Sequence, residues 1–332
     1  LAIGSIIGMG DFDSTIWGSG VHTEKNIQNI NIFWTNPHYY RLLRLNPFSF
    51  PEGIHVLEHM DRLIEILNVC WPLYSAMPAI LKAAIERAYA SCGWDLVNSK
   101  RINNGSRVFP TFADLLRELP TVINESSYSS DAKGDYTGAL VTRVSSLTNG
   151  IMGSIFCSDG ELDDIVLFDQ NTIVDLSRVG STETKALMMG VLIMKLNEHR
   201  MSVGAGMNSN LRHVTVLEEA HNLLRRANGS ASELAAKSVE MISNSIAEMR
   251  SYGEGFLIVD QSPTSVDISA IKNTNTKIVM RLPEQSDFEA VGGSFGLKPE
   301  QIREISRLPR GSAIVSQSGW LEPVLTAIYA AS

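Results

Sequence analysis

Two adjacent glutamates follow an apolar stretch of the chain. In the segment LRHVTVLEEAHNLL, residues 211–224, an apolar run is followed by Glu218 and Glu219. Such a run is typical of a strand in the middle of a sheet, where each carboxylate is costly to desolvate and two like charges repel. Acids in such a place usually bind a cation or take a proton. The pair is therefore the first candidate for chemistry in this sequence.

Polar residues follow two further apolar runs. Asp260 and Gln261 come after GFLIV, and Arg281 comes after KIVM. Because the C-terminal ends of parallel strands meet in a crevice where ligands bind, we expect these side chains near the two glutamates. One acid could hold magnesium and its water shell, and the next could polarise an attacking water. Gln261 could sense a terminal phosphate. An arginine from a neighbouring subunit could neutralise the negative charge that builds up in the transition state. The alternative is a strand that enters a solvated helix start, where acids favour the positive end of the dipole.

Strands and helices alternate in the second half of the sequence. Several of the strands are uninterrupted apolar runs, which are typical of a parallel sheet that is covered on both faces. We expect the runs 255–259 and 277–280 to be buried strands of this kind. Residues 54–150 instead show apolar positions at helical spacing with no strand between them. We expect this segment to be an all-helical insertion, in which Pro120 and Gly150 each end a helix.

Composition narrows the class of protein. The chain has 332 residues, of which 44% are hydrophobic and 19% charged, as expected for one large or two smaller globular domains. A net charge of -8 argues against a wholly basic surface that coats nucleic acid, but not against a ring that grips DNA through a few basic residues.

Three cysteines without a CxxC pattern indicate a reducing, cytoplasmic setting. No apolar run reaches membrane-spanning length, so we expect no membrane partner. Because the first residue is a leucine, we also expect a longer gene product.

From about residue 37 to residue 332, the chain resembles the HerA/FtsK superfamily of ring-forming P-loop ATPases that pump or unwind DNA. It is more closely similar to a HerA-like helicase-domain group of ATP-binding proteins. The segments that carry the resemblance are RLNPFSFPEG, HMDRLIEILNVCWPLYSAMPAIL, YTGALVTRVSSLTNGI, IVDLSRVGSTETKALMMGVLIMKL, HVTVLEEAHNLL, AEMRSYGEGFLIVDQSP and NTNTKIVMRLPEQSD.

The resemblance implies a RecA-like P-loop ATPase core of the α/β class, built on a parallel sheet. The core would begin at residues 37–53 and continue, after the helical insertion at 54–150, through residues 151–332. Residues 1–36 are of uncertain origin. The implied function is an ATP-driven DNA translocase or helicase motor that uses ATP and Mg²⁺ and acts as a ring, most simply a hexamer. It would contact DNA without reading its sequence.

The same resemblance assigns roles to the candidate residues. Glu218 matches the Walker B acid, which holds Mg²⁺ through water, and Glu219 matches the catalytic glutamate. Gln261 matches the sensor glutamine. Arg250 and Arg281 match two arginine positions, either of which could act on the nucleotide of a neighbouring subunit.

Asp175 and Arg178 form a further candidate pair. They follow the apolar strand NTIV, so that their polar groups could reach the nucleotide crevice. Pairing of the two with each other, or with a neighbouring subunit, is an equally good interpretation.

The sequence departs from the family at the phosphate loop. The motif GxxxxGK[ST], whose backbone N–H groups and lysine hold phosphates, does not occur. The nearest stretch, WGSGVHTEKN, has Val21 and His22 in place of the lysine and hydroxyl residue, and Lys25 lies at a different spacing. Either the loop lies upstream of this sequence, or the beginning is foreign or degenerate. The second explanation favours a catalytically silent scaffold that assembles a partner nuclease or other effector. A similarity of the first 25 or so residues to polysaccharide pyruvyl transferases leaves a sugar-modifying enzyme as a third hypothesis.

Two other stretches allow competing interpretations. HVLEH, residues 55–59, fits a zinc-peptidase pattern with two histidines on one helical face, although a solvated helix start is the favoured interpretation. Lys100, Arg101 and Arg107 form a basic loop that either contacts DNA phosphates or is simply exposed.

The segment after the glutamates also leaves alternatives open. His221 could orient the acids or make a structural hydrogen bond. Arg225 and Arg226 could line the pore of a ring.

Overall fold

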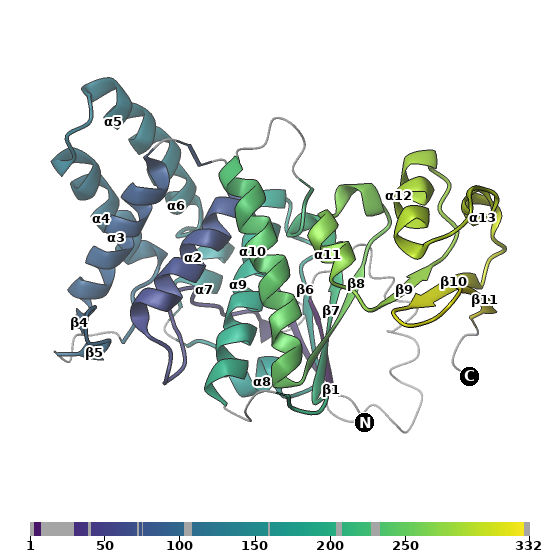
Figure 1. The fold of residues 1–332 in the computed structure, drawn as a ribbon. Helices are drawn as coiled ribbons and strands as arrows, with labels where there is room; N and C mark the ends of the chain where they lie inside the picture. Colours follow the sequence, from purple (N-terminus) through teal and green to yellow (C-terminus); the bar gives the residue numbers. More distant parts are fainter. Residues whose placement is uncertain are drawn as a thin grey trace.

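A six-stranded parallel sheet lies at the centre of the protein (Figure 1). The computed structural model describes residues 3–7, 30–38, 41–71, 73–74, 76–102, 108–158, 160–203, 208–226 and 233–328. The strand order is β3-β2-β6-β1-β7-β8, and every neighbouring pair runs parallel. The strands are β1 (Ile3–Ile7), β2 (Asn31–Trp34), β3 (Arg41–Leu42), β6 (Thr172–Asp175), β7 (His213–Glu218) and β8 (Glu254–Val259). The predicted α/β fold with a parallel sheet is confirmed.

The register brings the C-terminal ends of the central strands to one edge. Ile7 of β1 pairs with Leu217 of β7, and Glu218 pairs with Val259 of β8. Strand β1 lies between β6 and β7, so the first residues of the chain contribute a central strand. The polar residues that end these strands therefore share one edge of the sheet.

Three long helices pack together beside the sheet. Helices α9 (Thr182–Ser202) and α10 (Glu233–Met249) contact each other, and α2 (Val56–Cys70) packs against both (Figure 1). Helix α9 begins at Ser181, whose side chain accepts a hydrogen bond from the backbone N–H of Thr184. It is buried over most of its length. Because α2 packs on α9 and α10, the first helix of the predicted insertion is part of the same layer.

The rest of the segment 54–150 is helical, apart from a short hairpin. Its helices are α3 (Met77–Ser91), α4 (Phe112–Glu125), α5 (Ser130–Tyr136), a π-helix (Thr137–Val141) and α6 (Thr142–Ser146), followed by α7 (Gly150–Phe156). The hairpin pairs β4 (Trp94–Asp95) with β5 (Lys100–Arg101). The segment was predicted without strands, so the hairpin is a small correction.

Two predicted helix ends are wrong. Helix α4 continues through Pro120 to Glu125, although an interior proline removes one hydrogen bond and costs about 3 kcal/mol. Leu115, Leu119 and Ile123 are all fully buried on both sides of the proline, and this packing outweighs the cost. Gly150 does not end a helix either, because α6 ends at Ser146 and Gly150 begins α7.

A second, smaller sheet follows β8. It contains β9 (Thr276–Val279), β10 (Ser312–Gln317) and β11 (Val324–Ala327) in the antiparallel order β11-β10-β9. Helices α12 (Gln285–Phe295) and α13 (Pro299–Glu304) accompany it, and α11 (Ile268–Lys272) lies between β8 and β9 in the chain. This unit has its own core, in which Val279, Phe295 and Ile314 pack together.

The prediction that the runs 255–259 and 277–280 are buried strands is wrong. Strand β8 is the last strand of the parallel sheet, and its Leu257 and Val259 are 48% and 40% exposed. Strand β9 belongs to the antiparallel sheet, and its Ile278 is 56% exposed. A short apolar run identifies a strand, but whether both faces are covered depends on neighbours that are distant in the sequence.

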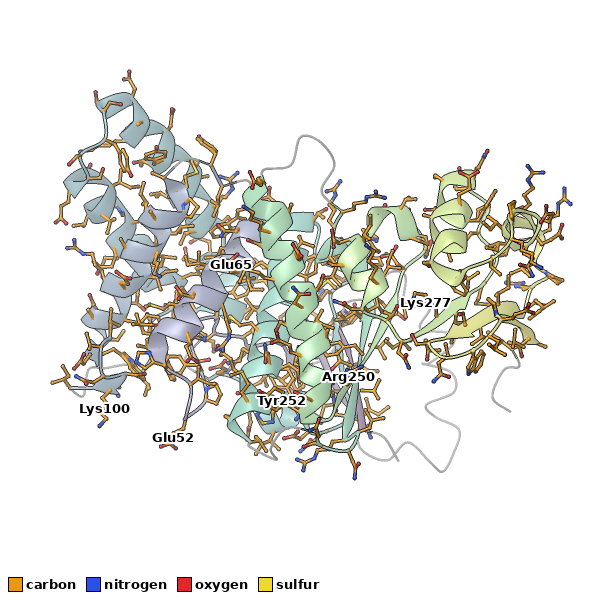
Figure 2. All side chains as sticks on the ribbon, in the orientation of Figure 1. Glu52, Glu65, Lys100, Arg250, Tyr252 and Lys277 are labelled. Atoms are coloured by element: carbon orange, nitrogen blue, oxygen red, sulfur yellow. The ribbon has the colours of Figure 1, made fainter. Side chains whose placement is uncertain are left out.

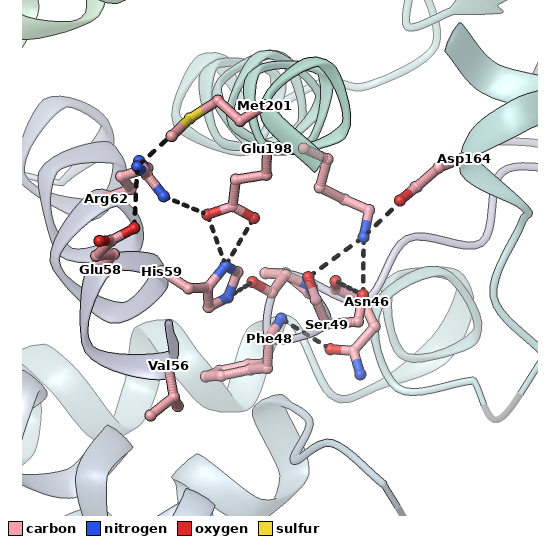
Figure 3. A network of polar contacts seen from close by, with 12 residues as sticks. Asn46, Phe48, Ser49, Val56, Glu58, His59, Arg62, Asp164, Glu198 and Met201 are labelled. Carbon is pink, nitrogen blue, oxygen red and sulfur yellow. Dashed lines mark hydrogen bonds and ion pairs between the residues drawn. The ribbon is translucent and has the colours of Figure 1, made fainter. Parts of the chain in front are cut away.

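Buried charges fix α9 to α2 and to the loop before it (Figure 3). Lys195 Nζ donates to Ser49 Oγ at 2.8 Å and lies 2.8 Å from Glu161 Oε1. Glu198, which is fully buried, lies 2.9 Å from His59 Nδ1 and accepts a hydrogen bond from Arg62 at 3.2 Å. Each of these charges has a partner, as buried charges require. Helix α9 is thus held rigidly in the middle of its length.

The zinc interpretation of residues 55–59 is not supported by this geometry. Both ring nitrogens of His59 have partners, since Nε2 lies 3.1 Å from the carbonyl oxygen of Pro47. His55 caps α2 by accepting a hydrogen bond from the backbone N–H of Leu57. Within the described ranges, no group of three or more metal-ligating side chains could hold an ion.

Candidate active site

Glu218 and Glu219 lie where β7 reaches the edge of the sheet. Glu218 is the last residue of β7, while Glu219 adopts the left-handed conformation, with φ 49° and ψ 49°. This conformation costs about 1 kcal/mol for a residue with a side chain. It reverses the chain into a short 3₁₀ helix (Ala220–Asn222), whose Asn222 N–H donates to the carbonyl oxygen of Glu219 at 2.9 Å. The turn keeps both acids at the edge of the sheet.

The two acids have different electrostatic surroundings. Burial, and after it the charge of Glu219, raises the pKa of the Glu218 carboxyl above its ordinary value. Glu219 has a cation nearby, because Nζ of Lys185 lies 3.6 Å from its Oε2. The Lys185 side chain is only 16% exposed. Sequence reasoning did not single out Lys185, which lies in the first turn of α9.

Asp260 holds the turn after the glutamates in place. Its side chain is 6% exposed, and its Oδ2 accepts a hydrogen bond from the backbone N–H of His221 at 2.9 Å. His221 Nδ1 lies 2.8 Å from the same oxygen, and Oδ1 accepts from the N–H of Ser262. Of the two predicted roles for His221, the structure shows the structural hydrogen bond. Gln261, the next residue after Asp260, is exposed at the same edge.

Asp175 also reaches this edge, at the end of β6. It is buried, and its Oδ1 accepts a hydrogen bond from the backbone N–H of Ser177 at 2.8 Å. Arg178 is exposed. Among the ion pairs of the described residues, none joins Asp175 to Arg178. Asp175 shapes its own turn, and Arg178 is available to an outside partner.

Neither candidate arginine follows the C-terminal end of a strand of the parallel sheet. Arg250 comes just before β8, in the 3₁₀ helix Arg250–Tyr252, and is therefore at the opposite edge of the sheet from Glu218. Figure 2 shows Arg250 and Tyr252 at the end of α10 where β8 begins. They line a hollow of about 500 Å³ together with Asn244, Ala247, Glu248, Ser251 and Asn273. Arg281 is exposed and follows β9, so it belongs to the antiparallel sheet and not to the parallel one.

The remaining candidate residues are the basic side chains and the stretch that most resembles a phosphate loop. The stretch WGSGVHTEKN, with Lys25, lies outside them, as does Arg107. Lys100 is exposed and Arg101 half-buried in the β4–β5 hairpin. Arg225 and Arg226 are exposed.

The donor set at the edge fits a magnesium–nucleotide complex. Mg²⁺ is commonly held through one or two carboxylates together with substrate phosphates and water. Glu218 and Glu219 supply two adjacent carboxylates of this kind, both half-buried. Such a site would need a phosphorylated ligand to complete the coordination.

Comparison with curated proteins identifies similar sequences that are described as DNA repair helicases. No protein-family model matches the chain. The chain is 20% identical over 300 residues to the DNA double-strand break repair helicase HerA of Sulfurisphaera tokodaii. The aligned region covers 89% of this chain and 54% of the relative. The chain thus spans about half the length of this curated relative.

Solved structures share the fold of this chain. VirB4 of Thermoanaerobacter pseudethanolicus superposes with a TM-score of 0.67 at 14% identity, covering 99% of this chain and 82% of VirB4. The plasmid coupling protein TrwB in complex with ADP and Mg²⁺ gives a TM-score of 0.58 at 10% identity, covering 99% and 85%. In the part of the chain that the structure describes, no helix is long and apolar enough to cross a bilayer.

Proposed function

Because the chain belongs to the HerA/FtsK superfamily of P-loop ATPases, we propose that it is the larger part of an ATP-driven motor that translocates or unwinds DNA. One structural observation carries the proposal. Glu218 and Glu219 lie at the C-terminal edge of a parallel sheet, beside the end of β8 that carries Asp260 and Gln261. Ligands of open α/β sheets bind at this edge.

The acids would divide the work of hydrolysis. Glu218 would hold Mg²⁺ through water, and the ion would neutralise charge on the phosphates of ATP. Glu219 would accept a hydrogen bond from the attacking water and polarise it. Gln261 would contact the terminal phosphate from the end of β8, and Asp175 and Arg178 would lie at the margin of the same site. The half-buried position of both acids supports these roles, because a partly desolvated site strengthens their electrostatic effect.

An arginine would act across a subunit boundary. Arg250 lies at the opposite edge of the sheet from Glu218, so it can reach a nucleotide only in a neighbouring copy of the chain. Arg281, on the antiparallel sheet, is the alternative. Either arrangement requires a homo-oligomeric ring, and we propose a hexamer. DNA would pass through the ring and be held by its phosphates rather than its bases.

A scaffold without catalytic activity is the second candidate function. It is favoured by one observation, the lack of a GxxxxGK[ST] motif in the sequence. Such a scaffold would assemble a partner nuclease or other effector without turning over ATP. Its assembly would not depend on nucleotide.

Hydrolysis and assembly measured together distinguish the two functions. The purified protein is assayed for ATP turnover with and without double-stranded DNA of two unrelated sequences, and its mass in solution is measured with and without ATP. The motor predicts turnover that DNA of either sequence stimulates, and a ring that ATP stabilises. No turnover together with a ring that forms equally well without ATP would contradict the motor and support the scaffold.

A further inference from the structure

We propose that Lys185 is a positioning residue for Glu219. Its ammonium group holds one carboxylate oxygen of Glu219 and leaves the other oxygen to accept a hydrogen bond from water. This inference rests on the proposed function, since it assigns Lys185 a part in the action of the same glutamate.

One cation and one hydrogen-bond donor converge on a single oxygen of Glu219. Lys185 Nζ lies 3.6 Å from Oε2, and Nδ2 of Asn222 donates to the same Oε2 at 3.3 Å. The contacts of the described residues include none to Oε1. The carboxylate is therefore anchored on one side and open on the other.

The position of Lys185 is costly unless the ion pair compensates it. Lys185 lies in the first turn of α9, where its own N–H donates to the carbonyl oxygen of the N-cap residue Ser181. The positive end of a helix dipole disfavours a cation there by several tenths of a kcal/mol or more. The side chain is also largely removed from water, at 16% exposed. The carboxylate of Glu219 is the group that offsets both effects.

The helix that carries Lys185 cannot shift easily. Lys195 pairs with Glu161 in the middle of the helix, and the buried Glu198 contacts His59 (Figure 3). At its C-terminal end, Arg200 pairs with the fully buried Glu254 at 2.8 Å. The ammonium group is therefore presented from a rigid support, as positioning of a reacting group requires.

Anchoring matters because, among the described residues, the contacts of the Glu219 carboxylate are those with Lys185 and with Asn222, its neighbour in the same turn. Glu219 follows the strand in a left-handed turn, and its side chain is 31% exposed. Holding Oε2 restricts the carboxylate to orientations in which Oε1 remains open. A displacement of about 1 Å in such a group can reduce turnover about 100-fold.

Substitution of Lys185 separates positioning from binding. Lys185→Met is expected to lower kcat for ATP by about 10- to 100-fold with little change in KM, because Glu219 is still present but poorly oriented. Lys185→Arg keeps the cation and should restore most of the activity. Lys237→Met is the control, because Lys237 is exposed and forms a surface ion pair with Glu233.

A second measurement does not depend on turnover. In protein labelled with ¹³C at glutamate, the δ-carboxyl resonance of Glu219 is assigned by its loss in Glu219→Gln. Relaxation of this carbon should show greater mobility in Lys185→Met than in the wild type or in Lys185→Arg.

The outcomes distinguish the inference from the proposed function. If Glu219→Gln abolishes turnover but Lys185→Met retains the wild-type kcat, the motor stands and the positioning role is overturned. A raised KM with unchanged kcat overturns it as well, since Lys185 would then bind nucleotide. If the wild type turns over no ATP, the proposed motor function is rejected. Unchanged mobility of the Glu219 carboxylate in Lys185→Met would show that Lys185 does not position it.

Discussion

His221 and Asp260 join the ends of two neighbouring parallel strands. Asp260 Oδ2 accepts the backbone N–H of His221 at 2.9 Å and lies 2.8 Å from its Nδ1. His221 is two residues past Glu219, and Asp260 directly follows β8. The turn that carries the acids is therefore fastened to the adjacent strand. The positions of Glu218 and Glu219 should therefore depend on the Asp260 carboxylate.

Asp260→Ala should weaken both the turn and the fold. It leaves two backbone N–H groups, those of His221 and Ser262, without their acceptor, which costs about 1–3 kcal/mol. Urea denaturation measures the loss, and ATP turnover should fall with it. Asp135→Ala, at an exposed position on α5, is the control and should stay within about 0.5 kcal/mol of the wild type. Equal stabilities of the two variants would contradict this account of Asp260.

Two glutamates that contact the same arginine should differ greatly in their contribution to stability. Arg62 pairs with the fully buried Glu198 and with Glu58, whose side chain is 57% exposed. Glu198→Ala leaves His59 and Arg62 without a buried partner, and should cost about 3–5 kcal/mol. Glu58→Ala removes an exposed pair and should cost about 0–1 kcal/mol. Similar midpoints of thermal unfolding for the two variants would refute the buried network.

The pKa of Glu218 makes a specific prediction about pH. This carboxyl has a raised pKa in the folded protein, so it stays protonated where the unfolded chain has already lost the proton. Its contribution to stability is thus present below the unfolded pKa of about 4.5 and is lost as pH rises through the raised folded pKa. As pH rises from about 4 to about 7, the free energy of unfolding should therefore fall less in Glu218→Gln than in the wild type.

Glu219→Gln provides an internal check on the same effect. Removing the neighbouring charge should lower the pKa of Glu218 and reduce the pH-dependent loss. Denaturant titrations at a series of pH values measure all three proteins. Parallel profiles for the wild type and both variants would show that Glu218 is not perturbed.

Cysteine reactivity tests the packing around α2. Burial, followed by the charge of Glu183, raises the pKa of the Cys70 thiol, so little thiolate forms at neutral pH. Cys92 is also buried, whereas Cys157 is partly accessible. Titration of the native protein with a thiol reagent should label Cys157 first, and Cys70 only on unfolding. Early labelling of Cys70 would contradict the packing of α2 beside α9.

The candidate site was predictable where its signals are local. An apolar run that ends in Glu218 and Glu219 specifies a strand and the residues at its end, and the structure places them there. The same holds for Asp260 after β8 and for Asp175 at the end of β6. In each case, one short segment contains both the strand and its terminal polar group.

Contacts between distant segments were not predictable. Lys185 looks like one polar position in a helix until the packing of α9 brings it to Glu219. Strand β9 is apolar like β8, yet its pairing with β10 places it in a different sheet. The helix that continues through Pro120 depends on the burial of its apolar face, which outweighs the local effect of proline.

Glu219→Gln tests the central claim most directly. The substitution preserves size and removes the charge that is proposed to polarise water. Turnover of ATP by the variant should fall at least about 100-fold, while ATP binding, measured by calorimetry on the same protein, is retained. Hydrolysis by Glu219→Gln at the wild-type rate would contradict the assignment of the edge acids as the site of ATP hydrolysis.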